Sequence, residues 1–121
     1  MKLKTMMFFV SNISEAEHFY CNILGFQLKT KTENSIAFVL EDYDFIAFKC
    51  EKNAEVEDYS NVARSVFVFE VASIDKTFND LCAKGVKFLH KKPSENDFSR
   101  YAAFQDPFGN IHEISESKKD V

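Results

Sequence analysis

The sequence has no tryptophan and, among its 121 residues, only three cysteines, three glycines and two prolines. The odd number of cysteines and the lack of a Cys-x-x-Cys pair argue against a disulfide framework and a zinc knuckle. We therefore predict a cytoplasmic protein in which Cys21, Cys50 and Cys82 are small core side chains.

Long hydrophobic runs and large basic clusters are also missing. The apolar run within MKLKTMMFFVSN is far too short for a signal peptide or a membrane span, and it is typical of a first strand. The longest basic runs are Lys91-Lys92 and Lys118-Lys119, and the net charge is -4. This balance predicts neither nucleic acid nor a membrane as a partner.

Phenylalanine, in contrast, is abundant, with 14 copies in a chain that is 45% hydrophobic and 28% charged. The length fits one compact domain. So many aromatic rings must line a core, a cavity or an interface, because scattered exposure would favour aggregation. We predict that the protein is a homodimer.

The order of predicted elements repeats along the chain. TMMFFVSN predicts a strand, SNISEAEHFYCNILG an amphipathic helix, and FQLKTKTENSIAFVLEDYDFIAFKC three short strands. The strand SVFVFEV, the helix ASIDKTFNDLCAKG and the strands VKFLHKK, RYAAFQ and NIHEIS then follow in the same order. Ser14 with Glu17 has the form of a capping box, and Gly25 and Gly85 stand where the two helices close.

These patterns predict an α+β fold of two βαβββ modules. The modules cover about residues 3–50 and 65–115, a linker covers about 51–64, and the whole chain, 1–121, forms a single domain. Each helix covers one face of its sheet, which leaves the other face for the partner module or a second subunit.

This organisation, with VSNISEAEHFYCNILGFQL near the start and FQDPFGNIHEI near the end, resembles the vicinal oxygen chelate superfamily. That superfamily includes glyoxalase I, the extradiol dioxygenases, and the fosfomycin- and bleomycin-resistance proteins. The resemblance covers about Lys4 to Ser115 and implies curved mixed sheets that enclose a cleft. In DPFG, Asp106 accepts a turn hydrogen bond, Pro107 presets φ, and Gly109 suits the fourth position, so the motif fixes the register of the last hairpin.

The resemblance also implies where a metal ion would bind, since metal-dependent members carry a ligand on the first and last strand of each module. The corresponding positions here are Thr5, Ala47, Val66 and Glu113, and only Glu113 is a competent donor. A shift of one residue at the first three positions does not help, because it offers Lys4, Met6, Ile46, Phe48, Ser65 and Phe67. We predict no metal ion and no other cofactor.

Strand alternation places His112 and Glu113 on opposite faces, with His112 on the helix side. If Glu113 faces the cleft, the same alternation predicts an apolar lining typical of a small-molecule pocket. The predicted ligand-binding residues are Thr5, Met7, Phe9, Phe45, Ala47, Val66, Val68, Ile111 and Glu113, with Arg100 and Tyr101 near the mouth. Arg100 either holds an anionic group or is a solvated surface residue.

Two functions stay open. The first is a metal-free protein that binds or sequesters a small molecule, similar to the bleomycin-resistance type, with Glu113 in contact with a cationic ligand. The second is a lyase or dioxygenase-like enzyme with an atypical site, in which Glu113 is a candidate catalytic base. A domain whose ligand is only a regulator, and a Glu113 that is only a partly exposed acid, are the remaining alternatives.

Overall fold

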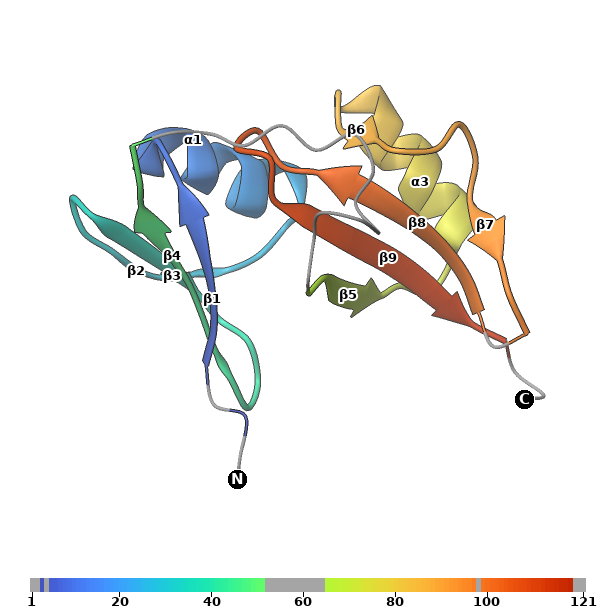
Figure 1. Ribbon diagram of the computed structural model, residues 1–121, viewed down its shortest axis with the longest axis horizontal. Coiled ribbons are helices and arrows are strands. Elements are labelled where there is room, and N and C mark those ends of the chain that lie inside the picture. The colour runs from blue at the N-terminus through green and yellow to red at the C-terminus, as the bar shows by residue number, and fades with distance from the viewer. Residues whose placement is uncertain (1–2, 4, 52–64, 98, 119–121) are drawn as a thin grey trace. The chain divides into compact units, whose positions relative to one another are not determined.

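The computed structural model describes residues 3, 5–51, 65–97 and 99–118 of the chain. The chain divides into two compact units, Met1–Ala54 and Glu55–Val121, which we call the first and second unit (Figure 1). The predicted linker lies almost entirely outside the described residues, and the joining of both units into a single domain stays a prediction. Within the described part of the chain, no helix has the length and apolar character needed to span a membrane.

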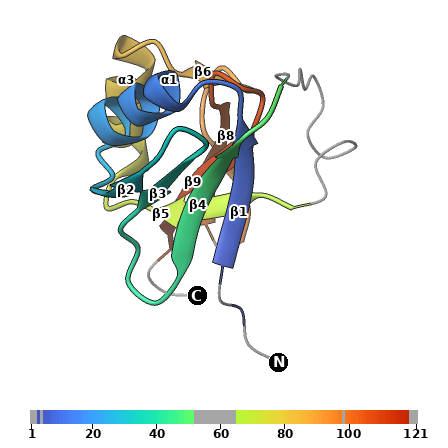
Figure 2. The same cartoon turned by 90° about the vertical axis from the view of Figure 1, so that its left-hand side faces the viewer.

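The first unit is a four-stranded sheet covered by a helix. The sheet order is β1-β4-β3-β2, with β1 parallel to β4 and the other pairs antiparallel. Figure 2 shows β1 and β4 running side by side. The elements are β1 (Thr5–Val10), α1 (Ile13–Glu17), the π-helical segment η1 (His18–Ile23), β2 (Leu28–Lys31), β3 (Ser35–Phe38) and β4 (Asp44–Lys49).

The second unit repeats this topology, which confirms the predicted α+β fold and the order of its elements. Its sheet order is β5-β9-β8-β6, with β5 parallel to β9, and β7 pairs with β8 beside this path. The helix α3 packs against β8 and β9 (Figure 1). The elements are β5 (Phe67–Glu70), α3 (Ile74–Ala83), β6 (Lys87–Phe88), β7 (Ser94–Glu95), β8 (Ser99–Gln105) and β9 (Ile111–Ser117).

The length predicted for the strand in VKFLHKK is wrong. Only Lys87 and Phe88 pair as β6, and the chain returns to β8 as the unpredicted strand β7. Pro93 stands just before β7 and has no N–H for a strand ladder, so the segment cannot continue as one regular strand.

Both helices begin at a side-chain cap and end at a glycine. Oδ1 of Asn12 accepts a hydrogen bond from the N–H of Glu15 at 2.9 Å, and Oγ of Ser73 accepts one from the N–H of Lys76 at 3.3 Å. The predicted cap at Ser14 is therefore wrong, because Ser14 already lies within the first turn. The predicted closing glycines are confirmed, since Gly25 and Gly85 both have φ of 87°, where a side chain is disfavoured.

The first helix widens into the π-helical segment η1, which the amphipathic pattern did not predict. The N–H of Leu24 donates to the carbonyl of Phe19 at 2.9 Å, five residues back. The wider turn allows two consecutive aromatic residues, Phe19 and Tyr20, to be buried at once. Tyr20 then packs on the sheet, with its ring centroid 5.0 Å from that of Phe8 and 5.2 Å from that of Phe38.

The core of the second unit is built around His112, which is only 1% exposed. Its ring stacks on Phe67 at a centroid distance of 5.7 Å, and the rings of Phe69 and Phe104 both lie 5.6 Å away. The helix-side position predicted for His112 is confirmed. Burial among these aromatic rings removes water from around the His112 ring, and this desolvation lowers its pKa from 6.5 to about 4. The ring is therefore neutral at pH 7.

The DPFG turn joins β8 to β9 through the carboxylate of Asp106, which is 4% exposed. Oδ1 accepts hydrogen bonds from the N–H groups of Phe108 and Asn110 at 2.9 and 2.8 Å, and Oδ2 accepts one from the Asn110 side chain at 2.7 Å. Gly109 has φ of 92°. The turn sets Gln105 opposite Ile111, so the predicted role in register is confirmed.

We predict that Asp106→Ala lowers the free energy of unfolding by about 2–4 kcal/mol, because it leaves one buried and two partly buried N–H donors without their acceptor. Asp106→Asn keeps one side-chain oxygen and should lose less. Urea unfolding followed by circular dichroism measures both variants. An alanine variant as stable as the wild type would show that the turn does not depend on this carboxylate.

We also predict a dependence of stability on pH that comes from His112. The folded protein holds this ring at a pKa of about 4, below the value of 6.5 in the unfolded chain. Unfolding therefore takes up a proton between these values, and stability that is complete above pH 6.5 falls by about 3 kcal/mol as the pH drops to 4.

The variant His112→Phe keeps an aromatic ring in the cluster and should lack this part of the pH dependence. His18→Gln, which changes an exposed histidine, should keep it and serves as the control. Unfolding free energies measured from pH 7 to pH 4.5 compare the three proteins. Equal slopes for the wild type and His112→Phe would contradict the prediction.

Candidate functional site

Each sheet has one face against its helix and one open face, and the strand register assigns every side chain to one of them. In the first unit, Met6 pairs with Phe45 and Phe8 with Ala47, and Phe8 and Phe45 contact Tyr20 on the helix side. The alternate positions lie on the open face. They are Thr5, Met7 and Phe9 on β1, and their partners Asp44, Ile46 and Phe48 on β4.

The open-face position predicted for Phe45 and Ala47 is therefore wrong. Phe45 is 1% exposed, Ala47 is fully buried, and both lie on the helix side. The error is one residue in the register of β4, and a shift of one residue exchanges the two faces of a strand. The positions predicted for Met7 and Phe9 agree with the register, and these side chains are 52% and 51% exposed.

The parallel pairs also identify which residues of the two units correspond. Met7 pairs with Ile46 in the first unit, and Val68 pairs with Glu113 in the second. Ile46, rather than Ala47, is thus the counterpart of Glu113. Isoleucine has no atom that coordinates a metal ion, so the corrected position still lacks a ligand.

The open face of the second sheet, which we call the Glu113 face, consists of three rows of side chains. In the middle row, Glu113 lies between Val68 and Ala103. The row toward the end of β9 contains Glu70, Ser115, Tyr101 and Ser94, and the row toward its start contains Ile111, Gln105 and Lys87. The predicted residue Val66 precedes β5 and is half-buried.

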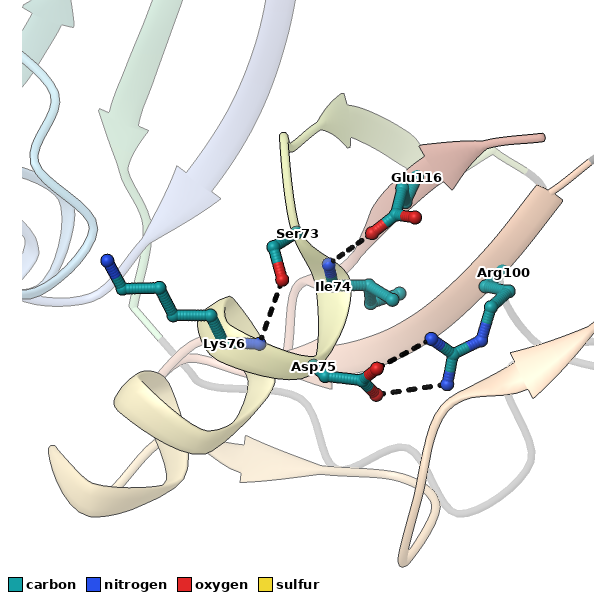
Figure 3. Close-up of polar contacts among 6 residues, drawn as sticks. All are labelled: Ser73, Ile74, Asp75, Lys76, Arg100 and Glu116. Atoms are coloured by element: carbon teal, nitrogen blue, oxygen red, sulfur yellow. Dashed lines mark hydrogen bonds and ion pairs between the residues drawn. The ribbon is translucent and has the colours of Figure 1, made fainter. Parts of the chain in front are cut away.

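Arg100 lies on the helix side and not on the Glu113 face, where a ligand was expected (Figure 3). Its Nη1 and Nη2 atoms donate to Oδ2 and Oδ1 of Asp75 at 2.8 and 3.0 Å. This bidentate pair lowers the pKa of Asp75 and raises that of Arg100. Arg100 is thus paired with Asp75 on the helix side, whereas Tyr101 lies on the Glu113 face.

Next to this pair, the side chain of Glu116 caps the start of α3. Its Oε1 atom accepts a hydrogen bond from the N–H of Ile74 at 2.8 Å, across 42 positions of sequence (Figure 3). The carboxylate complements the positive end of the helix dipole. No local sequence pattern predicts this contact, because the end of β9 and the first turn of α3 lie far apart in the chain.

A depression of about 710 Å³ lies where the parallel strands β5 and β9 end. Its polar groups already have partners within the protein, since Ser117 donates to Glu70 at 3.3 Å and Lys118 donates to Glu95 at 2.6 Å. We assign no ligand to this depression. Its lining residues are Glu70, Val71, Ala72, Glu116, Ser117 and Lys118.

The donor set around Glu113 does not fit a catalytic divalent ion. Such an ion needs several nitrogen or oxygen donors, but the neighbours of Glu113 in its row are Val68 and Ala103. Among the described residues, no three or more histidine, cysteine, aspartate or glutamate side chains cluster in a way that could hold a metal ion.

The family described as the Glyoxalase/Bleomycin resistance protein/Dioxygenase superfamily matches residues 2–114. The uncharacterized protein YraH of Bacillus subtilis (strain 168) is 31% identical over 125 residues, which cover 94% of this chain and 97% of that protein.

Two solved structures share the fold at low identity. One is TnmS3, an antibiotic binding protein from Streptomyces sp. CB03234, with a TM-score of 0.73, 16% identity, and coverage of 98% of this chain and 97% of that one. The other is lactoylglutathione lyase from Agrobacterium tumefaciens, with a TM-score of 0.72, 17% identity, and coverage of 95% and 92%. With the family match over most of the chain, the conclusion is that this protein belongs to the glyoxalase/bleomycin resistance protein/dioxygenase superfamily.

Proposed function

We propose that the protein is a metal-free small-molecule binding protein of the sequestration or resistance type, and that Glu113 holds a cationic group of the ligand. The observation that carries this proposal is the position of Glu113 in the middle row of the sheet face that points away from α3, between Val68 and Ala103. A carboxylate with apolar neighbours attracts a cation more strongly than one surrounded by water. Because the described residues contain no cluster of three or more candidate metal ligands, the proposed ligand is an organic cation rather than a metal ion.

The charges around Glu113 support the same choice of ligand. Arg100, the candidate for holding an anionic group, forms an ion pair with Asp75 on the opposite side of the sheet. Among the described strand residues of the Glu113 face, the cationic side chain is Lys87, and Glu70 adds a second negative charge. An anionic ligand would meet two carboxylates there, so it is disfavoured.

The relatives support a binding role without identifying a ligand. A structure with the same fold is described as an antibiotic binding protein, which supports the proposal that this chain sequesters a small molecule. Another is a lactoylglutathione lyase, so an enzyme that uses Glu113 as a base is the competing function. Contacts of Thr5, Met7, Phe9 and Val66 with the ligand, a cytoplasmic location and a homodimer remain parts of the proposal.

Calorimetric titration with a panel of aromatic and aliphatic amines, together with carboxylates of similar size, tests the proposal. We expect saturable binding of at least one amine and of no carboxylate. Glu113→Gln should weaken that binding by about 10- to 100-fold, because the variant removes a charge-assisted hydrogen bond. Glu41→Gln removes an equal charge from an exposed turn and should bind like the wild type. Failure of every amine to bind would contradict the proposal.

Metal analysis separates this function from the competing one. We expect protein purified without chelator to contain far less than one transition-metal ion per chain, because the described residues include no cluster of three or more candidate metal ligands. Stoichiometric nickel, zinc, iron or manganese, accompanied by turnover of a glutathione hemithioacetal or a catechol, would favour the enzyme instead.

A further inference from the structure

We propose that residues 70–73, which cross from β5 to α3, form a strap that opens separately from the rest of the second unit, and that Glu116 holds this strap closed. We call these four residues the strap. The proposal concerns a conformational device within the second unit, so it does not depend on which ligand the protein binds.

The end of β9 holds the strap through polar contacts at two points. The N–H of Val71 donates a hydrogen bond to the carbonyl of Ser115 at 2.9 Å. One residue further along β9, Oε1 of Glu116 accepts a hydrogen bond from the N–H of Ile74 at 2.8 Å, directly after the strap (Figure 3). The second contact is the stronger one, because its acceptor is charged and lies at the positive end of the helix dipole.

Apolar packing contributes little to the strap itself. Val71 is half-buried, and Glu70, Ala72 and Ser73 are exposed. The strap and the end of β9 both line the depression of about 710 Å³, so a hollow lies beside the contacts that join them. A segment with few buried apolar contacts opens at a lower free energy than the core. Polar contacts, rather than burial, therefore keep the strap in place.

Both ends of the strap are anchored in the core. Before it, the ring of Phe69 lies 5.6 Å from that of His112 within the aromatic cluster. After it, Ile74 is fully buried. These anchors limit the opening to the strap and to the amide groups of the first helical turn.

The first unit shows how the same crossover is built without this device. Val10 stands at the position of Val71 and is fully buried, so apolar packing anchors the first crossover. In the correspondence of β4 with β9, Lys49 stands at the position of Glu116. A lysine side chain accepts no hydrogen bond, and its charge is unfavourable at the start of a helix. The contact made by Glu116 is therefore particular to the second unit, where the apolar anchor is weaker.

Opening of the strap would change the charge distribution of the Glu113 face. Glu70 is both the last residue of β5 and the first residue of the strap, and Oγ of Ser117 donates to its Oε1 atom at 3.3 Å. Glu70 lies one row away from Glu113, so a displacement of the strap changes the distance between these two negative charges. The strap thereby gives the second unit a way to vary the electrostatic potential of this face.

Hydrogen exchange of single amides, followed by two-dimensional NMR of the wild-type protein, tests whether the strap opens as a unit. The reporters are the amides of Val71, Ile74 and Lys76, the last of which donates to Oγ of Ser73 at 3.3 Å. All three should share one protection factor, at least about 10-fold below that of the amides in the β8–β9 ladder. The ladder reports the opening of the whole unit.

The variant Glu116→Gln tests the role of Glu116. It replaces a charged acceptor with a neutral one, so exchange of all three reporters should become about 3- to 10-fold faster. The acceptor of Val71, the carbonyl of Ser115, is unchanged in this variant, so faster exchange of Val71 reports opening of the entire strap. Asp80→Asn removes a charge from an exposed position later in α3, and this control should leave the three reporters unchanged.

The wild-type measurement and the variants can each contradict the inference. If the wild-type reporters exchange as slowly as the β8–β9 ladder, the strap does not open separately. If Glu116→Gln accelerates Ile74 alone, Glu116 contributes one hydrogen bond and does not hold a strap. If Asp80→Asn accelerates the reporters as much as Glu116→Gln does, the effect is not specific to Glu116. Each of these results leaves the proposed binding function untouched.

Discussion

The parallel pairing of β5 with β9 is the constraint on which the candidate site depends. These strands come from opposite ends of the second unit, and their register sets Phe67 against His112 and Val68 against Glu113. The turn at Asp106 then aligns β8 on the other side of β9. Every assignment of a side chain to the helix side or to the open face follows from these two ladders, because a shift of one residue would exchange the faces.

This register explains why two adjacent ionisable residues have unrelated roles. His112 enters a cluster of aromatic rings, where it is neutral and contributes to packing. Glu113 points the other way, between small apolar neighbours on the open face. Their proximity in sequence suggests an acid/base pair or a shared metal ion, but the geometry of a strand separates them.

The two units show how one topology can carry two different surfaces. The open face of the first sheet has Met7, Ile46 and Phe48 where the second has Val68, Glu113 and Ser115. The helix-facing sides remain alike, with aromatic clusters against the helix in both units. Packing against the helix restricts the residue types on the helix-facing side of each sheet. The other side is not restricted in this way, so its residues indicate the function.

The sequence by itself determined the fold class, the repeat of two modules, the closing glycines at Gly25 and Gly85 and the structural role of the DPFG turn, because each depends on contacts within a few residues. The residue types alone also indicated that most of the positions expected to bind a metal ion cannot coordinate one. Only the tertiary structure decided the face of Phe45 and Ala47, the pairing of Arg100 with Asp75, and the burial of Gln105 on the Glu113 face. These features depend on register and on contacts between distant segments, and local periodicity cannot distinguish registers that differ by one residue.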